Sequence, residues 1–114
     1  MMPLQITDID GDAHQRHTIL LDDSEVVLSL RFHPTVEMWV ADVEYGGRKV
    51  SGFKLSVGVL HMRSQNFPFD IVVTDNTGQG TDPLRLDDFE SGRCSLYVLN
   101  AADMETLRGQ PVPL

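Results

Sequence analysis

The chain has 114 residues, of which 41% are hydrophobic and 23% are charged, a composition typical of one soluble globular domain. Its net charge of −8 at pH 7 argues against tight binding of nucleic acid, because phosphate contacts require clustered Lys and Arg. No apolar run approaches the roughly 18 residues of a membrane helix, and no basic segment precedes an apolar one, so we expect neither a membrane span nor a secretory signal.

The first part of the chain, residues 1–14, is acidic and predicts a loosely ordered, flexible arm. Asp8, Asp10 and Asp12 resemble the opening of a calcium-binding EF-hand loop, in which acidic ligands alternate along the chain. That loop also needs a glycine directly after its third ligand and a glutamate at its end, where this chain has an alanine and an isoleucine. We therefore expect a solvated acidic arm without a bound metal.

Period-two alternation predicts the next strands. Residues 15–21 are expected to form a short strand, and residues 25–33 alternate apolar and polar side chains, as in a half-buried strand. Proline follows this second run and ends it, because it cannot donate to a strand ladder. Residues 36–45 predict a third strand. Its core-facing side is expected to carry Trp39, Ala41, Val43 and Tyr45.

Gly46-Gly47 predicts a tight hairpin after this strand, because two-residue hairpin turns need positive φ angles that glycine adopts without strain. The returning strand begins at Arg48 and is expected to reach Leu60. Trp39 and Phe53 should then be buried across the hairpin.

The rest of the chain alternates strands with loops and turns. We expect a loop over 62–68, a strand over 69–74, a polar connection over 75–83, a helical turn over 86–93 closed by glycine, a strand over 94–99 and helical turns over 101–108. The pattern predicts an all-β, mainly antiparallel sandwich or small barrel of about six or seven strands, with one or two short helical turns. Its single domain covers residues 15–109, and residues 110–114 form a C-terminal tail.

Catalytic and metal-binding patterns are missing from the sequence. The four histidines lack metal-ligand spacing, and there is no nucleophile elbow, phosphate loop or dinucleotide fingerprint. The lone cysteine, Cys94, lies in an apolar strand, where a small buried side chain is a commoner role than a nucleophile. We expect no enzyme activity and no cofactor.

One strand is apolar on both of its faces. Val36, Met38 and Val40 lie opposite the predicted core face, before acidic residues make that side polar. A small domain needs only one buried face per strand, so a second apolar face is typical of a contact with another protein. Together with Phe67 and Phe69, these residues are our predicted interface.

The order of these segments is similar to that of a known family. A leucine-rich strand over 26–32 precedes a tryptophan strand over 38–43, a Gly-Gly turn and the run 51–58. The motifs Asp-Pro, Asp-Asp-Phe and Gly-Arg-Cys-Ser-Leu-Tyr-Val-Leu follow over 82–99. Over residues 17–99 the chain resembles the small baseplate plug proteins encoded in tail gene clusters of tailed bacteriophages.

This resemblance implies a structural role without catalytic residues. Such a subunit would be a plug or adaptor that joins the tail tube, hub and wedge proteins, in a homo-oligomeric ring of roughly three or six copies. It would belong to the tail baseplate of the virion and pass through the host cytoplasm during assembly. A surplus of acidic residues suits a component that DNA passes without binding.

Three other functions stay open at the level of the sequence. A stand-alone cytosolic β-barrel that binds a small molecule or a protein would need an apolar cavity, which the sequence neither shows nor excludes. A host chaperone or regulatory module would explain the acidity equally well. A small hydrolase would need a cluster of polar groups that the sequence does not display.

Overall fold

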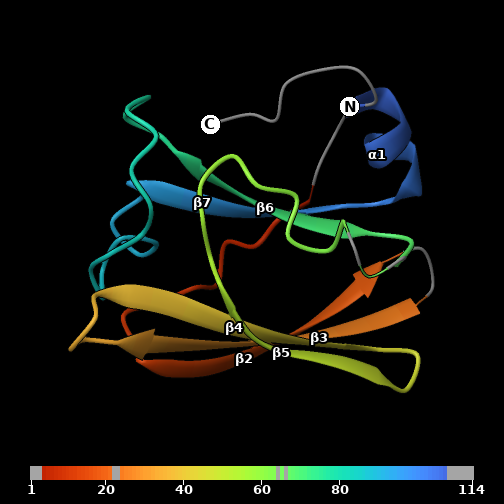
Figure 1. Ribbon diagram of the computed structural model, residues 1–114, viewed down its shortest axis with the longest axis horizontal. Helices are drawn as coiled ribbons and strands as arrows, with labels where there is room; N and C mark the ends of the chain where they lie inside the picture. The colour runs from red at the N-terminus through yellow and green to blue at the C-terminus, as the bar shows by residue number, and fades with distance from the viewer. Residues whose placement is uncertain (1–3, 22–23, 64, 66, 108–114) are drawn as a thin grey trace.

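A computed structural model describes residues 4–21, 24–63, 65 and 67–107 (Figure 1). Two antiparallel sheets face each other across one core. The larger sheet has the order β2 (His14–Leu21), β3 (Ser24–His33), β4 (Met38–Tyr45) and β5 (Arg48–Lys54). The smaller sheet has the order β1 (Leu4–Gln5), β7 (Cys94–Leu99) and β6 (Asp70–Asp75), and one helix, α1 (Ala101–Leu107), follows β7. The predicted all-β sandwich is confirmed.

The four-stranded sheet is a meander in which each strand pairs with its neighbour in sequence. The predicted hairpin between β4 and β5 is present, with Tyr45 opposite Arg48. Gly46 and Gly47 have φ angles of 57° and 79°, which are the positive values of a type I′ turn.

The core lies between the two sheets and is centred on Trp39, whose side chain is fully buried. The indole ring meets Phe89 edge to face at 5.5 Å, and its Nε1–H donates a hydrogen bond of 3.0 Å to the carbonyl oxygen of Arg85. The predicted core face of β4 is confirmed, since Ala41 and Val43 are also fully buried. Phe53 is only half-buried and packs against the margin of the core.

Strand β6 is buried on both faces, unlike a strand at the surface of a sandwich. One face contributes to the main core, and on the other Val72 and Leu99 pack beneath Leu60, Tyr97 and Met104. The segment after β5 leaves the larger sheet and reaches the smaller one, where Val57 makes a parallel bridge with Val73 of β6. The continuous apolar run of β6 is therefore explained by burial on two sides.

The predicted acidic arm is wrong for residues 4–13. Leu4 pairs with Val98 in β1, and the Ile6 N–H donates a hydrogen bond of 2.9 Å to the Leu96 carbonyl oxygen. Ile9 is only 6% exposed. The side chains of Ile6 and Ile9 pack in the core and hold the segment in place, although the Leu4 side chain is 44% exposed. Residues 1–3 and the predicted tail over 110–114 lie outside the described residues.

The returning strand ends earlier than predicted, at Lys54 instead of Leu60. A β-bulge shifts the register of β4 and β5 between Ala41 and Val43. At this bulge the N–H of Gly52, whose φ is 72°, donates a hydrogen bond of 2.7 Å to Asp42 Oδ1. The helical segment over 101–107 is confirmed as α1.

Candidate functional site

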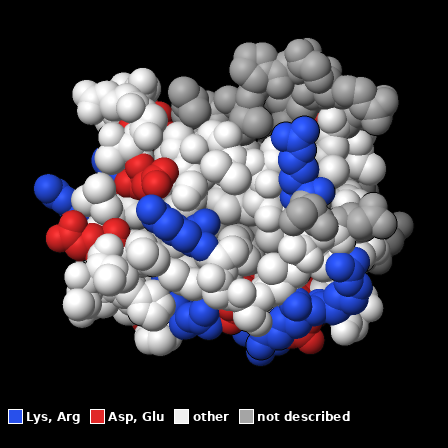
Figure 2. All heavy atoms as spheres, viewed as in Figure 1, with Lys and Arg blue, Asp and Glu red and all other residues white. Residues whose placement is uncertain are grey.

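The outer face of the four-stranded sheet is a candidate protein interface. Cross-strand pairs place Met38 opposite His33, and Val40 between Arg31 and Lys54. Lys and Arg side chains gather along the lower edge of the molecule, over this sheet (Figure 2). The basic residues at outward positions are Arg16, Arg31, Lys49 and Lys54. Glu25, Asp42 and Glu44 also lie at outward positions, so this face offers apolar side chains among charges of both signs.

Three residues of the predicted interface lie on or beside this face. Met38 and Val40 are half-buried on β4, and Val36 is 58% exposed in the turn before that strand. We define Val36, Met38 and Val40 as the β4 patch. Met38 and Val40 share the outer face of β4, and Val36 lies two residues before that strand.

Phe67 and Phe69 belong to the core instead, with exposures of 6% and 0%. Their rings stack at 5.1 Å, and each meets Tyr45 edge to face. The guanidinium of Arg48 covers Phe67 at 4.5 Å from the ring centre. The loop before β6 thus folds back onto the end of β4, and we restrict the predicted interface to the β4 patch.

An ion pair crosses the outer face beside this patch. Arg31 donates two hydrogen bonds to the Asp42 carboxylate, of 2.6 Å and 3.1 Å. Burial raises the pKa of Asp42, but the bonds from Arg31 and the Gly52 N–H outweigh it and lower the pKa below its ordinary value. Asp42 is therefore ionised at neutral pH and fixes both the bulge and the Arg31 side chain.

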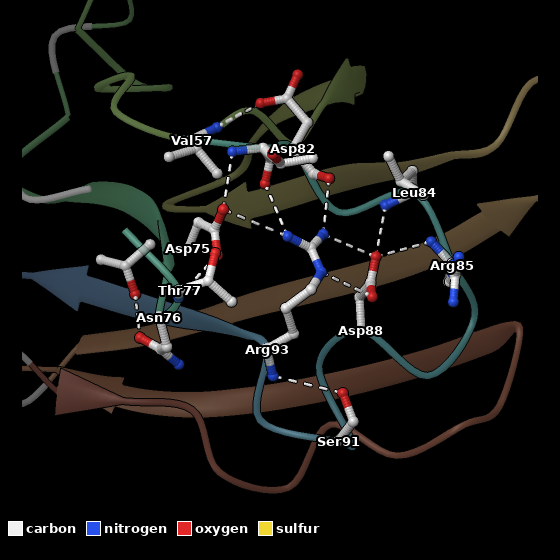
Figure 3. A network of polar contacts seen from close by, with 12 residues as sticks. Val57, Asp75, Asn76, Thr77, Asp82, Leu84, Arg85, Asp88, Ser91 and Arg93 are labelled. Carbon is white, nitrogen blue, oxygen red and sulfur yellow. Dashed lines mark hydrogen bonds and ion pairs between the residues drawn. The ribbon is translucent and has the colours of Figure 1, made fainter. Parts of the chain in front are cut away.

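A second polar network, centred on Arg93, ties the loops of the smaller sheet together (Figure 3). Arg93 donates hydrogen bonds of 2.9 Å and 2.8 Å to the two oxygens of Asp88. It also donates to the carbonyl oxygens of Thr81 and Asp82, and lies 3.5 Å from Asp75 Oδ2. The guanidinium is therefore occupied by the protein itself and is not a site for an external anion.

The two carboxylates of this network also accept bonds from the backbone. Asp88 accepts from the N–H groups of Leu84 and Arg85, and Asp75 accepts from those of Thr77 and Thr81. The bond from the Thr77 hydroxyl, followed by the backbone bonds from Thr81 and Thr77, holds the pKa of Asp75 at about 2. The bonds from Arg93 lower the pKa of Asp88 most, and the backbone bonds lower it further. Together they outweigh burial, which raises the pKa, and hold it at about 2.

Sequence reasoning missed this network. The sequence pattern predicted only a polar connection over 75–83 and a helical turn over 86–93, whereas Asp75 and Asp88 accept bonds from several segments at once. The sequence feature that could have indicated the network is the pair Asp88 and Arg93. These two residues lie on either side of a turn that ends at Gly92, where φ is 86°. Because both carboxylates stay ionised at neutral pH, neither holds a proton for acid catalysis.

His61 is also fully engaged by the fold. Its Nε2 accepts a hydrogen bond of 2.9 Å from the Ser56 N–H, and its Nδ1 lies 2.7 Å from the Ile71 carbonyl oxygen, to which it donates. Burial lowers the pKa of His61 below its ordinary value, against the opposing effect of the Ile71 carbonyl. A neutral imidazole with both nitrogens bonded is a structural link between the β5–β6 connection and β6.

Cys94 is buried at 2% exposure, and burial raises the pKa of its thiol to about 11. We expect iodoacetamide at pH 8 to alkylate the native protein about 100-fold or more slowly than the chain unfolded in urea, because the thiolate is the reacting form. Mass spectrometry of timed samples measures both rates. Equal rates would contradict the buried position of Cys94.

Within the described part of the chain, no three His, Cys, Asp or Glu residues are arranged to hold a metal ion. None of its helices is long and apolar enough to span a membrane.

Comparison with known proteins identifies the family. The family model described as cyanophage baseplate Pam3 plug gp18 matches residues 4–101. The chain belongs to this baseplate plug family. A search of curated proteins finds no match. The family match begins at β1 and ends at the start of α1, so it covers both sheets of the sandwich.

Membership of the baseplate plug family confirms the resemblance found in the sequence. As a member, the protein is a structural component of the phage tail baseplate and associates with other baseplate proteins. In this baseplate plug protein Met38 and Val40 are half-buried on the outer face of β4, whereas Asp88, Arg93 and His61 are bonded within the monomer.

Proposed function

We propose that the protein is a non-catalytic plug or adaptor subunit that joins the tail tube, hub and wedge proteins of the baseplate. The observation that carries this proposal is the match of the baseplate plug family to residues 4–101, nearly the whole sandwich. In this proposal the subunit assembles in the host cytoplasm into a homo-oligomeric ring of roughly three or six copies.

The β4 patch is the proposed contact with a neighbouring baseplate protein. It combines an exposed side chain, Val36, with the half-buried Met38 and Val40, beside the ion pairs of Arg31 with Asp42 and of Lys54 with Asp82. Protein interfaces usually have an apolar centre surrounded by a polar or charged rim. The ionic pair of Arg31 with Asp42 keeps the sheet rigid where the neighbour would bind.

The absence of catalysis is supported by the chemistry of the polar groups. Asp75 and Asp88 are ionised and bonded to Arg93, His61 is neutral and bonded at both nitrogens, and the thiol of Cys94 is buried. A binding barrel, the alternative favoured by sequence alone, would need a closed wall around a cavity. The described strands instead form two sheets whose facing side chains pack together.

Replacing Met38 with aspartate tests the β4 patch. We expect Met38→Asp to change the free energy of unfolding by less than about 1 kcal/mol, because the side chain lies on the solvent face. Its incorporation into particles should fall at least about tenfold, since a carboxylate buried without a partner in an interface is costly. Complementation of a phage lacking the gene, followed by quantification of the subunit in purified virions, measures incorporation.

Ser51→Asp is the matched control, because Ser51 is exposed on β5 outside the β4 patch. It should be incorporated normally. Normal incorporation of Met38→Asp would show that the β4 patch is not a contact. Equal loss of folding and assembly would show that Met38 belongs to the core.

A further inference from the structure

The four-stranded sheet ends at β2, and the hydrogen bonds of this strand show which of its backbone groups are free. The Phe32 N–H donates a hydrogen bond of 2.9 Å to the carbonyl oxygen of Ala13, the residue before β2. In an antiparallel pair, alternate residues face the partner strand. Consistent with this alternation, the N–H of His14 does not bond to β3 but donates to Asp12 Oδ1 at 3.2 Å.

It follows that the backbone N–H and C=O groups of Arg16, Thr18 and Leu20 point away from β3. Within the described residues, no hydrogen bond reaches these outward groups. Beside them lies an open groove of about 380 Å³, lined by residues 4–8 and 16–20. The Leu20 side chain is 72% exposed. In the part of the chain that the structure describes, β2 is therefore an unpaired strand edge whose outward side chains, Arg16, Thr18 and Leu20, are exposed.

The opposite edge of the sheet, β5, is protected against such pairing. It carries Lys49 and Lys54 and is distorted by the bulge at Gly52, which are two of the ways in which proteins prevent strand addition. A β5 strand from another molecule would also place lysines beside Arg16, and like charges across a strand pair are destabilising. β2 lacks lysine, proline and a bulge.

We infer that β2 pairs antiparallel with β2 of a second copy of this chain, across a two-fold axis at Thr18. In this register Thr18 lies opposite the second copy's Thr18, and Arg16 lies opposite the second copy's Leu20. Threonine pairs are favourable across antiparallel strands. The exposed Leu20 is covered by the methylene groups of arginine, and no like charges meet along the pair.

Charge complementarity supports this choice of partner. Within one molecule Leu20 lies opposite Glu25, whereas Arg16 lies opposite Ser29, so Arg16 and Glu25 are about 13 Å apart along the strands. In the pair of molecules, Arg16 of one copy crosses Leu20 of the other and reaches its Glu25. The two-fold axis forms this ion pair twice. The contact is separate from the β4 patch and does not rest on the proposed function. It is a contact of the free protein in solution, because a two-fold pair is not the cyclic contact of a ring.

A cysteine at the two-fold axis tests both the contact and its register. Opposed backbones at a hydrogen-bonded pair are about 5.5 Å apart, within the span of a disulfide. Mild oxidation of the full-length Thr18→Cys protein should therefore give a covalent dimer. In Leu20→Cys the two introduced thiols are about 13 Å apart, and the native Cys94 is buried. We expect at least about tenfold more covalent dimer from Thr18→Cys; equal yields, or none from either, would overturn the proposal.

Exchange of charges gives a second test that needs no new thiol. Sedimentation of the wild-type protein over a concentration series should show a monomer–dimer equilibrium. Arg16→Glu and Glu25→Arg should each weaken dimerisation about tenfold or more, and the double variant should recover most of it. A protein that stays monomeric at its highest soluble concentration, or a double variant as weak as the single ones, would contradict the inference.

Discussion

Replacing Trp39 with alanine is expected to lower the free energy of unfolding by about 3–5 kcal/mol, the range for removal of a large buried aromatic side chain. Trp39 is fully buried, packs on Phe32 and Phe89, and fills the space between the two sheets. Urea denaturation monitored by circular dichroism measures the loss. Val36→Ala is the control, because Val36 is 58% exposed, and it should change stability by less than about 0.5 kcal/mol.

Trp39→Phe separates packing from hydrogen bonding at the same position. It keeps an aromatic ring but removes the Nε1–H that bonds to the Arg85 carbonyl oxygen. We expect a loss of about 1–3 kcal/mol, since the smaller ring leaves a cavity and the Arg85 carbonyl oxygen keeps only its bond from the Asp88 N–H. A loss below about 1 kcal/mol for Trp39→Ala would mean that the indole is at the surface, contrary to the structure.

Replacing Arg93 with methionine is expected to cost about 3 kcal/mol, the lower end of the range for breaking a buried ion pair. The side chains of Asp75 and Asp88 are 0% and 4% exposed, whereas Arg93 itself is 23% exposed. Both carboxylates would remain buried without their cation. Arg85→Met is the matched control, because Arg85 is exposed nearby and bonds to the fold only through its backbone; it should cost less than about 0.5 kcal/mol.

The same network predicts how stability depends on pH. Asp75 and Asp88 have pKa values of about 2 in the folded protein, below the ordinary 3.8. Carboxylates with a lowered folded pKa stabilise the protein above the unfolded pKa, and this contribution is lost as pH falls. We expect stability to drop between about pH 4 and pH 2, and less steeply in Arg93→Met than in the wild type. Parallel pH curves for the two proteins would contradict the role of Arg93.

The regular part of the larger sheet was predictable from local patterns. Alternation over β3 and β4 gives the correct core face because only one face of each of these strands is buried in the core. Trp39 and Val43 both lie on the buried face of β4. The turn at Gly46-Gly47 follows from φ angles that few other residues adopt. These signals act between residues close in sequence, which is why they can be read without the structure.

The missed features depend on contacts between distant segments. Leu4 pairs with Val98, and the alternation over residues 4–7 is too short to indicate a strand without its distant partner. Phe67 looks like a surface residue of a loop until that loop is placed against Tyr45. The Arg93 network joins residues from several turns, and its bond to Asp88 was hidden by the usual role of aspartate in turns.

The two sheets also differ in when they can form during synthesis. The four-stranded sheet uses one continuous stretch, residues 14–54, so its pairs are available as soon as that stretch leaves the ribosome. The smaller sheet needs β7 between β1 and β6, and β7 is made almost last. Until then Trp39 has no opposing layer, so the nascent chain exposes the apolar face of a finished sheet. Slow, late closure by long-range pairing is the expected rate-limiting step of folding.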